Sequence, residues 1–128
     1  MNNKDIAGEW FIFANNDLNS AKFLLNMKPL PLEIICYHCQ QSAEKYLKGY
    51  IALNGGDILR THDLTILNKI CRKYDERFKE LEEDCIELVD YGVHVRYPFH
   101  IDLEEYDMKK ALESAHNIEN FIRNIIKW

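Results

Sequence analysis

Apolar residues recur every three or four positions along almost the whole chain, and this spacing constrains the fold more than any other feature. Over residues 5–27 one such row is Ala7, Phe11, Ala14, Leu18, Ala21 and Leu25. A second row, Ile6, Trp10 and Phe13, continues through Asp17 to Leu24, so we expect this helix to be packed on two sides. The period matches the 3.6 residues per turn of an α-helix, whereas a half-buried strand would alternate with a period of two. No stretch of the sequence alternates in that way, so we predict an all-α fold.

Prolines and glycines divide this periodic pattern into separate helices. Pro29 and Pro31 end the first helix, because proline has no backbone N–H and disfavours helical geometry in the residue before it. Gly55 and Gly56 end the second helix, and Pro98 ends the fourth. The predicted helices therefore cover about 5–27, 32–54, 63–73, 76–96 and 103–127.

Four of these helices are long, and the one over 63–73 is short, with Thr61 or Asp63 as its N-cap. Long helices joined by short or moderate links have one economical arrangement, the up-down-up-down bundle. A chain of 128 residues also has the size of one ordinary domain. We predict a single domain over 1–128, a four-helix bundle with one additional short helix on its second connection.

The composition is that of a globular protein, with 47% hydrophobic and 29% charged residues. A net charge of -5 and a pI near 5.5 argue against a broad basic face for long nucleic acids, although a local basic pocket stays compatible with them. The polar start of the chain leads into an amphipathic stretch, without the apolar run of a signal peptide or membrane span. We expect a cytoplasmic protein that does not enter a membrane.

Two short patterns have the spacing of metal or redox sites. Cys36 and Cys39 form a C-x-x-C pair, but they belong to buried helical rows, and a zinc site would need two further ligands nearby. Glu113 and His116 match a di-iron motif that such bundles carry on two helices, and here it occurs once. We therefore expect reduced, metal-free core cysteines, a plain helix face at Glu113, and no cofactor.

Asp17 and Gln40 each interrupt an otherwise apolar row. A polar side chain in such a position needs a hydrogen-bond partner. The two could meet across the bundle, either as a structural pair that fixes the helix register or as part of a ligand site.

The second predicted helix also carries a polar stripe. Gln41, Lys45 and Lys48 share one face by i, i+4, i+7 spacing, and Glu44 can pair with Lys48. The stripe is either an exposed charged face or a set of ligand contacts.

A histidine and an arginine near helix ends are further candidates. His62 precedes the cap of the short helix and belongs to the residue type that titrates near neutrality. Arg96 and His100 flank two aromatic residues, and such a group can hold a phosphate and supply an acid or base for metal-independent RNA cleavage. Alternatively, Arg96 faces the backbone carbonyls at the end of its helix.

Five short motifs run from the first predicted helix to the last. They are Ala14-x-x-Asp17-Leu18-x-x-Ala21, His38-x-Gln40-Gln41-x-Ala43-Glu44-Lys45-x-Leu47-Lys48, Thr61-His62-Asp63-Leu64, Arg96-Tyr97-Pro98 and Ala111-Leu112-x-x-Ala115. Together they resemble the HEPN domain proteins of prokaryotes over nearly the whole chain. The Gln-Gln-x-Ala-Glu-Lys block followed by Thr-His-Asp-Leu is the most specific part.

The resemblance implies a bundle of four long helices, usually a homodimer, often acting beside a small nucleotidyltransferase in a toxin–antitoxin-like pair. The family name itself implies nucleotide binding. Many members that act as toxins are ribonucleases with an Arg-x4-6-His motif. Here only three residues separate Arg96 from His100, and Pro98 lies between them, so the chain looks more like the branch of the family without that motif.

We therefore predict a homodimeric module that binds a nucleotide or a partner nucleotidyltransferase. Its candidate ligand contacts are Gln41, Lys45, Lys48, His62 and Arg96. One alternative is a ribonuclease toxin that is independent of metal and uses Arg96 and His100, and another is a purely structural interaction protein.

Homodimer formation is also predicted from the apolar pattern. The helices carry two apolar rows each, which is more than a four-helix core needs, and spare apolar surface favours a partner copy. The residues expected to form that surface are Tyr91, Val95, Tyr97 and Phe99.

Overall fold

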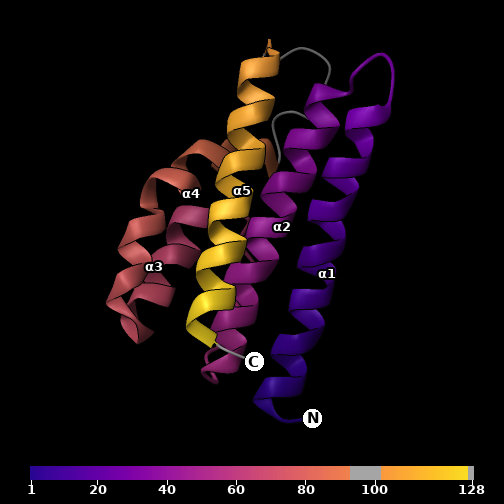
Figure 1. The fold of residues 1–128 in the computed structure, drawn as a ribbon. Coiled ribbons are helices and arrows are strands. Elements are labelled where there is room, and N and C mark those ends of the chain that lie inside the picture. The colour runs from indigo at the N-terminus through magenta and orange to yellow at the C-terminus, as the bar shows by residue number, and fades with distance from the viewer. Residues whose placement is uncertain (93–101, 127–128) are drawn as a thin grey trace.

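The structure, a computed structural model, describes residues 1–92 and 102–126. Over these residues it is helical and contains no strand, which confirms the predicted all-α class (Figure 1). The α-helices are α1 (Asn3–Phe23), α2 (Leu32–Leu53), α3 (Leu64–Tyr74), α4 (Glu82–Leu88) and α5 (Glu105–Ile126). Three short 3₁₀ segments accompany them, η1 (Leu24–Asn26), η2 (Glu76–Leu81) and η3 (Val89–Gly92).

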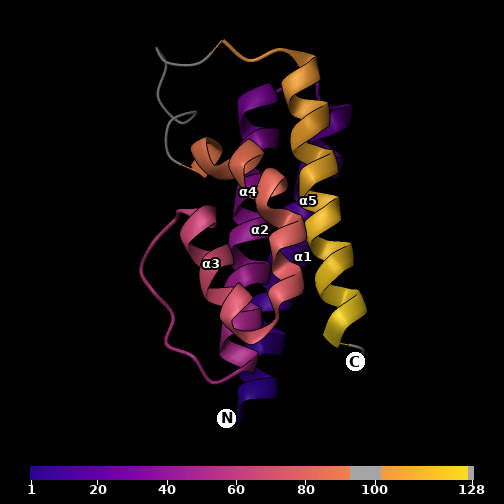
Figure 2. The ribbon, with the colours of Figure 1, turned by 90° about the vertical axis from the view of Figure 1, so that its left-hand side faces the viewer.

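The central helix of the bundle is α2, which contacts α1, α3 and α5. In Figure 1, α1 runs upward and α2 downward, and α5 also runs downward to the C-terminus. The segment from η2 through α4 runs upward beside α5, and α3 sits on the connection between α2 and η2 (Figure 2). The predicted up-down-up-down bundle with one additional short helix is thus confirmed.

Small residues bring α1 close to α2. The buried face of α1 consists of Ala7, Ala14, Leu18 and Ala21. Opposite it, Gly49 of α2 has no room for a side chain, since a Cβ there would lie 2.5 Å from Cε1 of Phe11 and 3.0 Å from Cβ of Trp10. The close approach of the two helices therefore requires glycine at position 49.

The opposite face of α1 lies at the surface. Two apolar rows predicted neighbours on both sides of this helix, but in the described part of the chain α1 packs mainly on α2. The second row, Ile6, Trp10 and Phe13, lines a surface hollow instead. That prediction is wrong because α1 is an edge helix and α2 occupies the centre.

One continuous helix over 76–96 was predicted, and for the described residues up to 92 this is also wrong. The segment consists of η2, α4 and η3. Two of its apolar pairs, Phe78 with Leu81 and Leu88 with Tyr91, are spaced by three residues, which suits the three-residue turn of a 3₁₀-helix. Tyr91 is buried in the chain's own core and is not spare surface. The other residues expected there, Val95, Tyr97 and Phe99, lie outside the described residues.

The N-cap of α3 and the burial of the cysteines agree with the predictions from the sequence. Asp63 caps α3, because its side chain accepts a hydrogen bond from the Thr65 backbone N–H at 2.9 Å. The four cysteines are unbonded and buried, as expected of core residues, and burial raises the pKa of the Cys36 and Cys85 thiols to about 12. No helix in the described ranges is long and apolar enough to cross a membrane.

Candidate functional site

Glu44 is buried near the middle of α2, and three polar groups converge on its carboxylate. Nζ of Lys48, one turn further along, donates to Oε2 at 2.9 Å. On the other oxygen, Oε1, Nδ1 of His62 lies at 2.9 Å and Nε2 of Gln40 donates at 3.2 Å. A buried carboxylate needs such partners, because its ionised form is strongly disfavoured without them.

These contacts determine the charge of Glu44. Burial by itself would raise the pKa of the carboxyl group, but hydrogen bonds from Lys48, His62 and Gln40 outweigh it, and the pKa of Glu44 is lowered. The side chain is therefore an anion at neutral pH. Lys48 balances its charge, and the Lys48 ammonium also lies 5.9 Å from the ring centroid of Trp10, a cation–π distance.

His62 is the exposed member of this group. Its side chain is 60% exposed, whereas that of Glu44 is 6% exposed. The carboxylate favours a proton on Nδ1, which leaves Nε2 to accept a hydrogen bond from a ligand or, in the charged form, to donate one. Nε2 of Gln40 also donates to the backbone oxygen of His62 at 3.1 Å, so the loop that carries the histidine is fixed to α2 at two points.

Gln41 and Gly92 complete the group around Gln40. Nε2 of Gln41 donates to Oε1 of Gln40 at 2.7 Å. Gly92, at the end of η3, packs directly on the same amide, where an added Cβ would lie 2.7 Å from Cδ of Gln40. Arg96 follows Gly92 by four positions in the sequence, but Arg96 and His100 lie outside the described residues.

Lys45 belongs to a second network between α1 and α2. Its Nζ bonds Oδ2 of Asp17 at 2.5 Å, and Nδ1 of His38 lies 3.0 Å from the other oxygen, Oδ1. Asp17 and Gln40, which the sequence suggested could meet, thus have different partners. Of the predicted ligand contacts, Gln41, Lys48 and His62 come together, and Lys45 bonds elsewhere.

Both networks contain a carboxylate, a histidine and a lysine. Each carboxylate, Asp17 or Glu44, bonds one histidine through Nδ1 and one lysine through Nζ. The sequence indicated the Glu44 to Lys48 pair but neither carboxylate–histidine pair. For Asp17 a signal did exist, because His38 and Lys45 are seven residues apart and therefore lie on the same face of α2.

The di-iron motif is not a metal site in the structure. Glu113 is exposed, and Nδ1 of His116 instead lies 3.6 Å from Oε1 of Glu119. The Glu119 carboxylate accepts a hydrogen bond from the Tyr46 hydroxyl at 2.9 Å, which links α2 to α5. Within residues 1–92 and 102–126 no three histidines, cysteines or acidic residues are grouped so that they could hold a metal ion.

The family model described as HEPN domain matches residues 7–125. A relative from Methanocaldococcus jannaschii, named "Putative toxin MJ1304", is 31% identical over 130 residues, which is 89% of this chain and 84% of the relative. No solved structure matches the chain.

Proposed function

The chain belongs to the HEPN domain family, and on that basis we propose that it is the HEPN member of a two-protein, toxin–antitoxin-like pair. It acts as a homodimer beside a small nucleotidyltransferase, and the surface around His62 binds a nucleotide or that partner. The relative's name, which contains the word toxin, supports the choice of such a pair.

One observation carries the assignment of the surface, namely the exposed His62 held by the buried Glu44. A buried ion pair such as Glu44 with Lys48 adds little net stability compared with apolar residues of similar volume. The pair does, however, hold an exposed imidazole in one orientation and one tautomer, which is how proteins prepare a side chain for a ligand.

The local charges suit a phosphate group. Lys48 neutralises the Glu44 carboxylate, so a phosphate near His62 meets a balanced pair, and a protonated His62 adds one positive charge. The second amide hydrogen of Gln41 is a further donor of the kind that phosphates accept. Arg96, which lies outside the described residues, stays a predicted phosphate contact. A nucleotide, or a nucleotide held by the partner, is the ligand class that this set of donors favours.

The proposal is tested by calorimetric titration of the purified protein with AMP, ATP and a nucleotidyltransferase encoded beside it. We expect His62→Ala to weaken binding at least tenfold while the circular dichroism spectrum stays unchanged. His116→Ala is the matched control, because His116 also lies near a carboxylate but on α5, and it should bind like the wild type. Equal binding by both variants, or no binding by the wild type, contradicts the proposal.

Two further measurements address oligomeric state and catalysis. Light scattering should give a dimer at micromolar concentration, and a monomer would refute the homodimer. Incubation with total RNA tests the ribonuclease alternative. If the wild type cleaves RNA and His100→Ala abolishes cleavage without loss of the fold, the protein is a ribonuclease toxin that uses His100. If the wild type binds neither nucleotide nor partner and cleaves no RNA, it is a structural interaction protein.

A further inference from the structure

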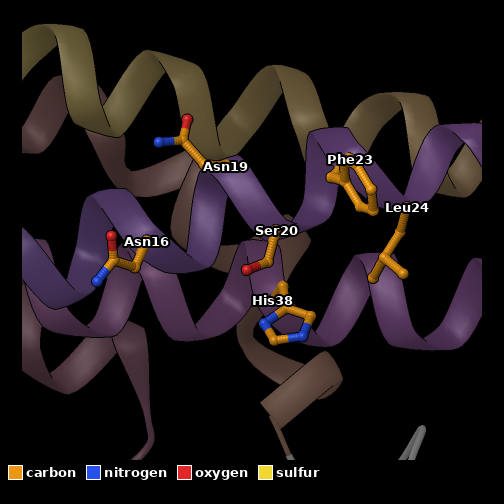
Figure 3. A pocket seen from close by; sticks show the side chains of 6 residues that line it. All are labelled: Asn16, Asn19, Ser20, Phe23, Leu24 and His38. Carbon is orange, nitrogen blue, oxygen red and sulfur yellow. The ribbon is translucent and has the colours of Figure 1, made fainter.

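A surface hollow with both polar and apolar lining residues lies at the seam between α1 and α2, separate from the Glu44 network. Four of its lining residues, Asn16, Asn19, Ser20 and Phe23, come from one face of α1 at i, i+3, i+4 and i+7 spacing (Figure 3). Leu24 from η1 and His38 from α2 complete the lining. We call this site the His38 hollow.

The histidine in this hollow is held in place from behind. Nδ1 of His38 lies 3.0 Å from Asp17, and Lys45 bonds the other oxygen of the same carboxylate. The lysine balances the charge of Asp17, so the imidazole meets a neutral pair. With Nδ1 engaged, Nε2 is the ring nitrogen left for a ligand.

The remaining lining residues define the chemistry of the ligand. Neither a lysine, an arginine nor an acidic residue is among the six residues that line the hollow, so they favour neither a phosphate nor a cation. Two side-chain amides and one hydroxyl supply neutral donors and acceptors. Phe23 is 75% exposed, and an aromatic ring that stays in water is available for stacking.

A flat ring with hydrogen-bonding edges fits this combination best. Asparagine amides pair with the adjacent donor and acceptor on the edge of a nucleobase. Proteins that bind unpaired bases stack them on exposed aromatic side chains. An imidazole beside such a base can hydrogen-bond a ribose hydroxyl, which both donates and accepts.

We propose that the His38 hollow binds a nucleobase, either in a free nucleoside or unpaired in an RNA strand. The base stacks on Phe23, the amides of Asn16 and Asn19 bond its edge, and Nε2 of His38 bonds the ribose. This inference goes beyond the proposed function, because it concerns a different site and the ring of the ligand. The proposed function has His62 contact a phosphate.

The experiment is a titration of isotope-labelled full-length protein, followed by NMR, in two arms. One arm uses adenosine and uridine, and the other uses a short single-stranded oligoribonucleotide. We expect the side-chain amide signals of Asn16 and Asn19 and the ring signals of His38 to shift. Response in the first arm identifies a nucleoside site, and response in the second arm alone identifies an RNA-strand site.

Matched variants show whether the His38 hollow is responsible for this binding. Phe23→Ala should weaken binding about fivefold or more, the low end for loss of one base–aromatic stack. Phe13→Ala is the control, because Phe13 is also exposed on α1 but lines the other hollow, and it should leave binding unchanged. Both residues are exposed, so neither variant should unfold the protein.

Three results would overturn the inference. The first is the absence of any shift in either arm at millimolar ligand, and the second is equal weakening by Phe13→Ala and Phe23→Ala. The third is a shift of the hollow's signals on adding the nucleotidyltransferase alone, without any effect of base-containing ligands, which would make the hollow a protein contact. Since His62→Ala leaves the hollow intact, failure here and failure of the proposed function are distinguishable.

Discussion

Replacement of Lys48 by methionine tests whether the ion pair of Lys48 with Glu44, below His62, is shielded from solvent as the structure indicates. Glu44 is 5% exposed and Lys48 is 7% exposed. Lys48→Met keeps most of the side-chain volume but leaves the carboxylate buried without its cation. Removal of one partner from a buried pair costs about 3–5 kcal/mol, whereas removal from an exposed pair costs below about 1 kcal/mol.

The assay is equilibrium unfolding in urea, followed by circular dichroism. For a domain of this size, the expected loss corresponds to a decrease in Tm of about 10–20 °C. The double variant Glu44→Leu/Lys48→Met should be more stable than Lys48→Met, because it leaves no unpaired buried charge.

The chain contains a matched surface pair for comparison. Arg72 and Glu76 are also four residues apart, with Nη2 2.7 Å from Oε1, but both side chains are substantially exposed. Glu76→Gln should therefore cost about 0.5 kcal/mol or less. If Lys48→Met costs no more than Glu76→Gln, the Glu44 pair is solvated, and the reasoning that it holds His62 for a ligand is refuted.

Three other predictions concern packing, pH and thiol chemistry. Gly49→Ala should destabilise the protein by about 1–2 kcal/mol in urea unfolding, because the added Cβ would collide with Phe11. This loss is expected despite the higher helix propensity of alanine, and unchanged or higher stability would contradict the close approach of α1 and α2. The lowered pKa of Glu44 contributes stability that is fully present above the ordinary glutamate value of 4.5 and is lost as the pH falls below it. In the wild type the unfolding free energy should fall between roughly pH 5 and pH 3, the range in which a carboxyl group with a lowered pKa titrates. Glu44→Gln should make this fall less steep, and an unchanged slope would contradict the lowered pKa of Glu44. Burial raises the pKa of Cys36 and Cys85 to about 12, so at pH 8 the native protein should react with a thiol reagent only as fast as the protein unfolds locally. Elemental analysis should find no stoichiometric zinc.

Much of the fold was predictable because the helix boundaries depend on local chemistry. Pro31 precedes α2, Gly55 with a φ of 75° follows its end, and Asp63 caps α3. Each of these signals is legible in the sequence. The helix predicted over 76–96 failed because apolar residues spaced by three and four fit both an α-helix and 3₁₀ turns. Only packing against the rest of the bundle decides between them.

The candidate site was predictable only in part, because its contacts join distant segments. The pairing of Glu44 with Lys48 follows from spacing within one helix. By contrast, His62 reaches Glu44 from a loop 18 residues further along the chain, and Asp17 reaches His38 from 21 residues away. Periodicity within one helix contains no information about such pairs, so the sequence placed Lys45 with Lys48 although they bond different carboxylates.

The close seam between α1 and α2 also has a consequence for the order of folding. The eight residues 24–31 join these two helices, and a short connection costs little loop-closure entropy. α5, in contrast, begins at Glu105 and reaches α2 only across a long intervening chain. Local contacts of high density form early in helical proteins, so we expect the α1–α2 hairpin to form first during synthesis. The Asp17 to His38 network would then form before α5 has packed on α2.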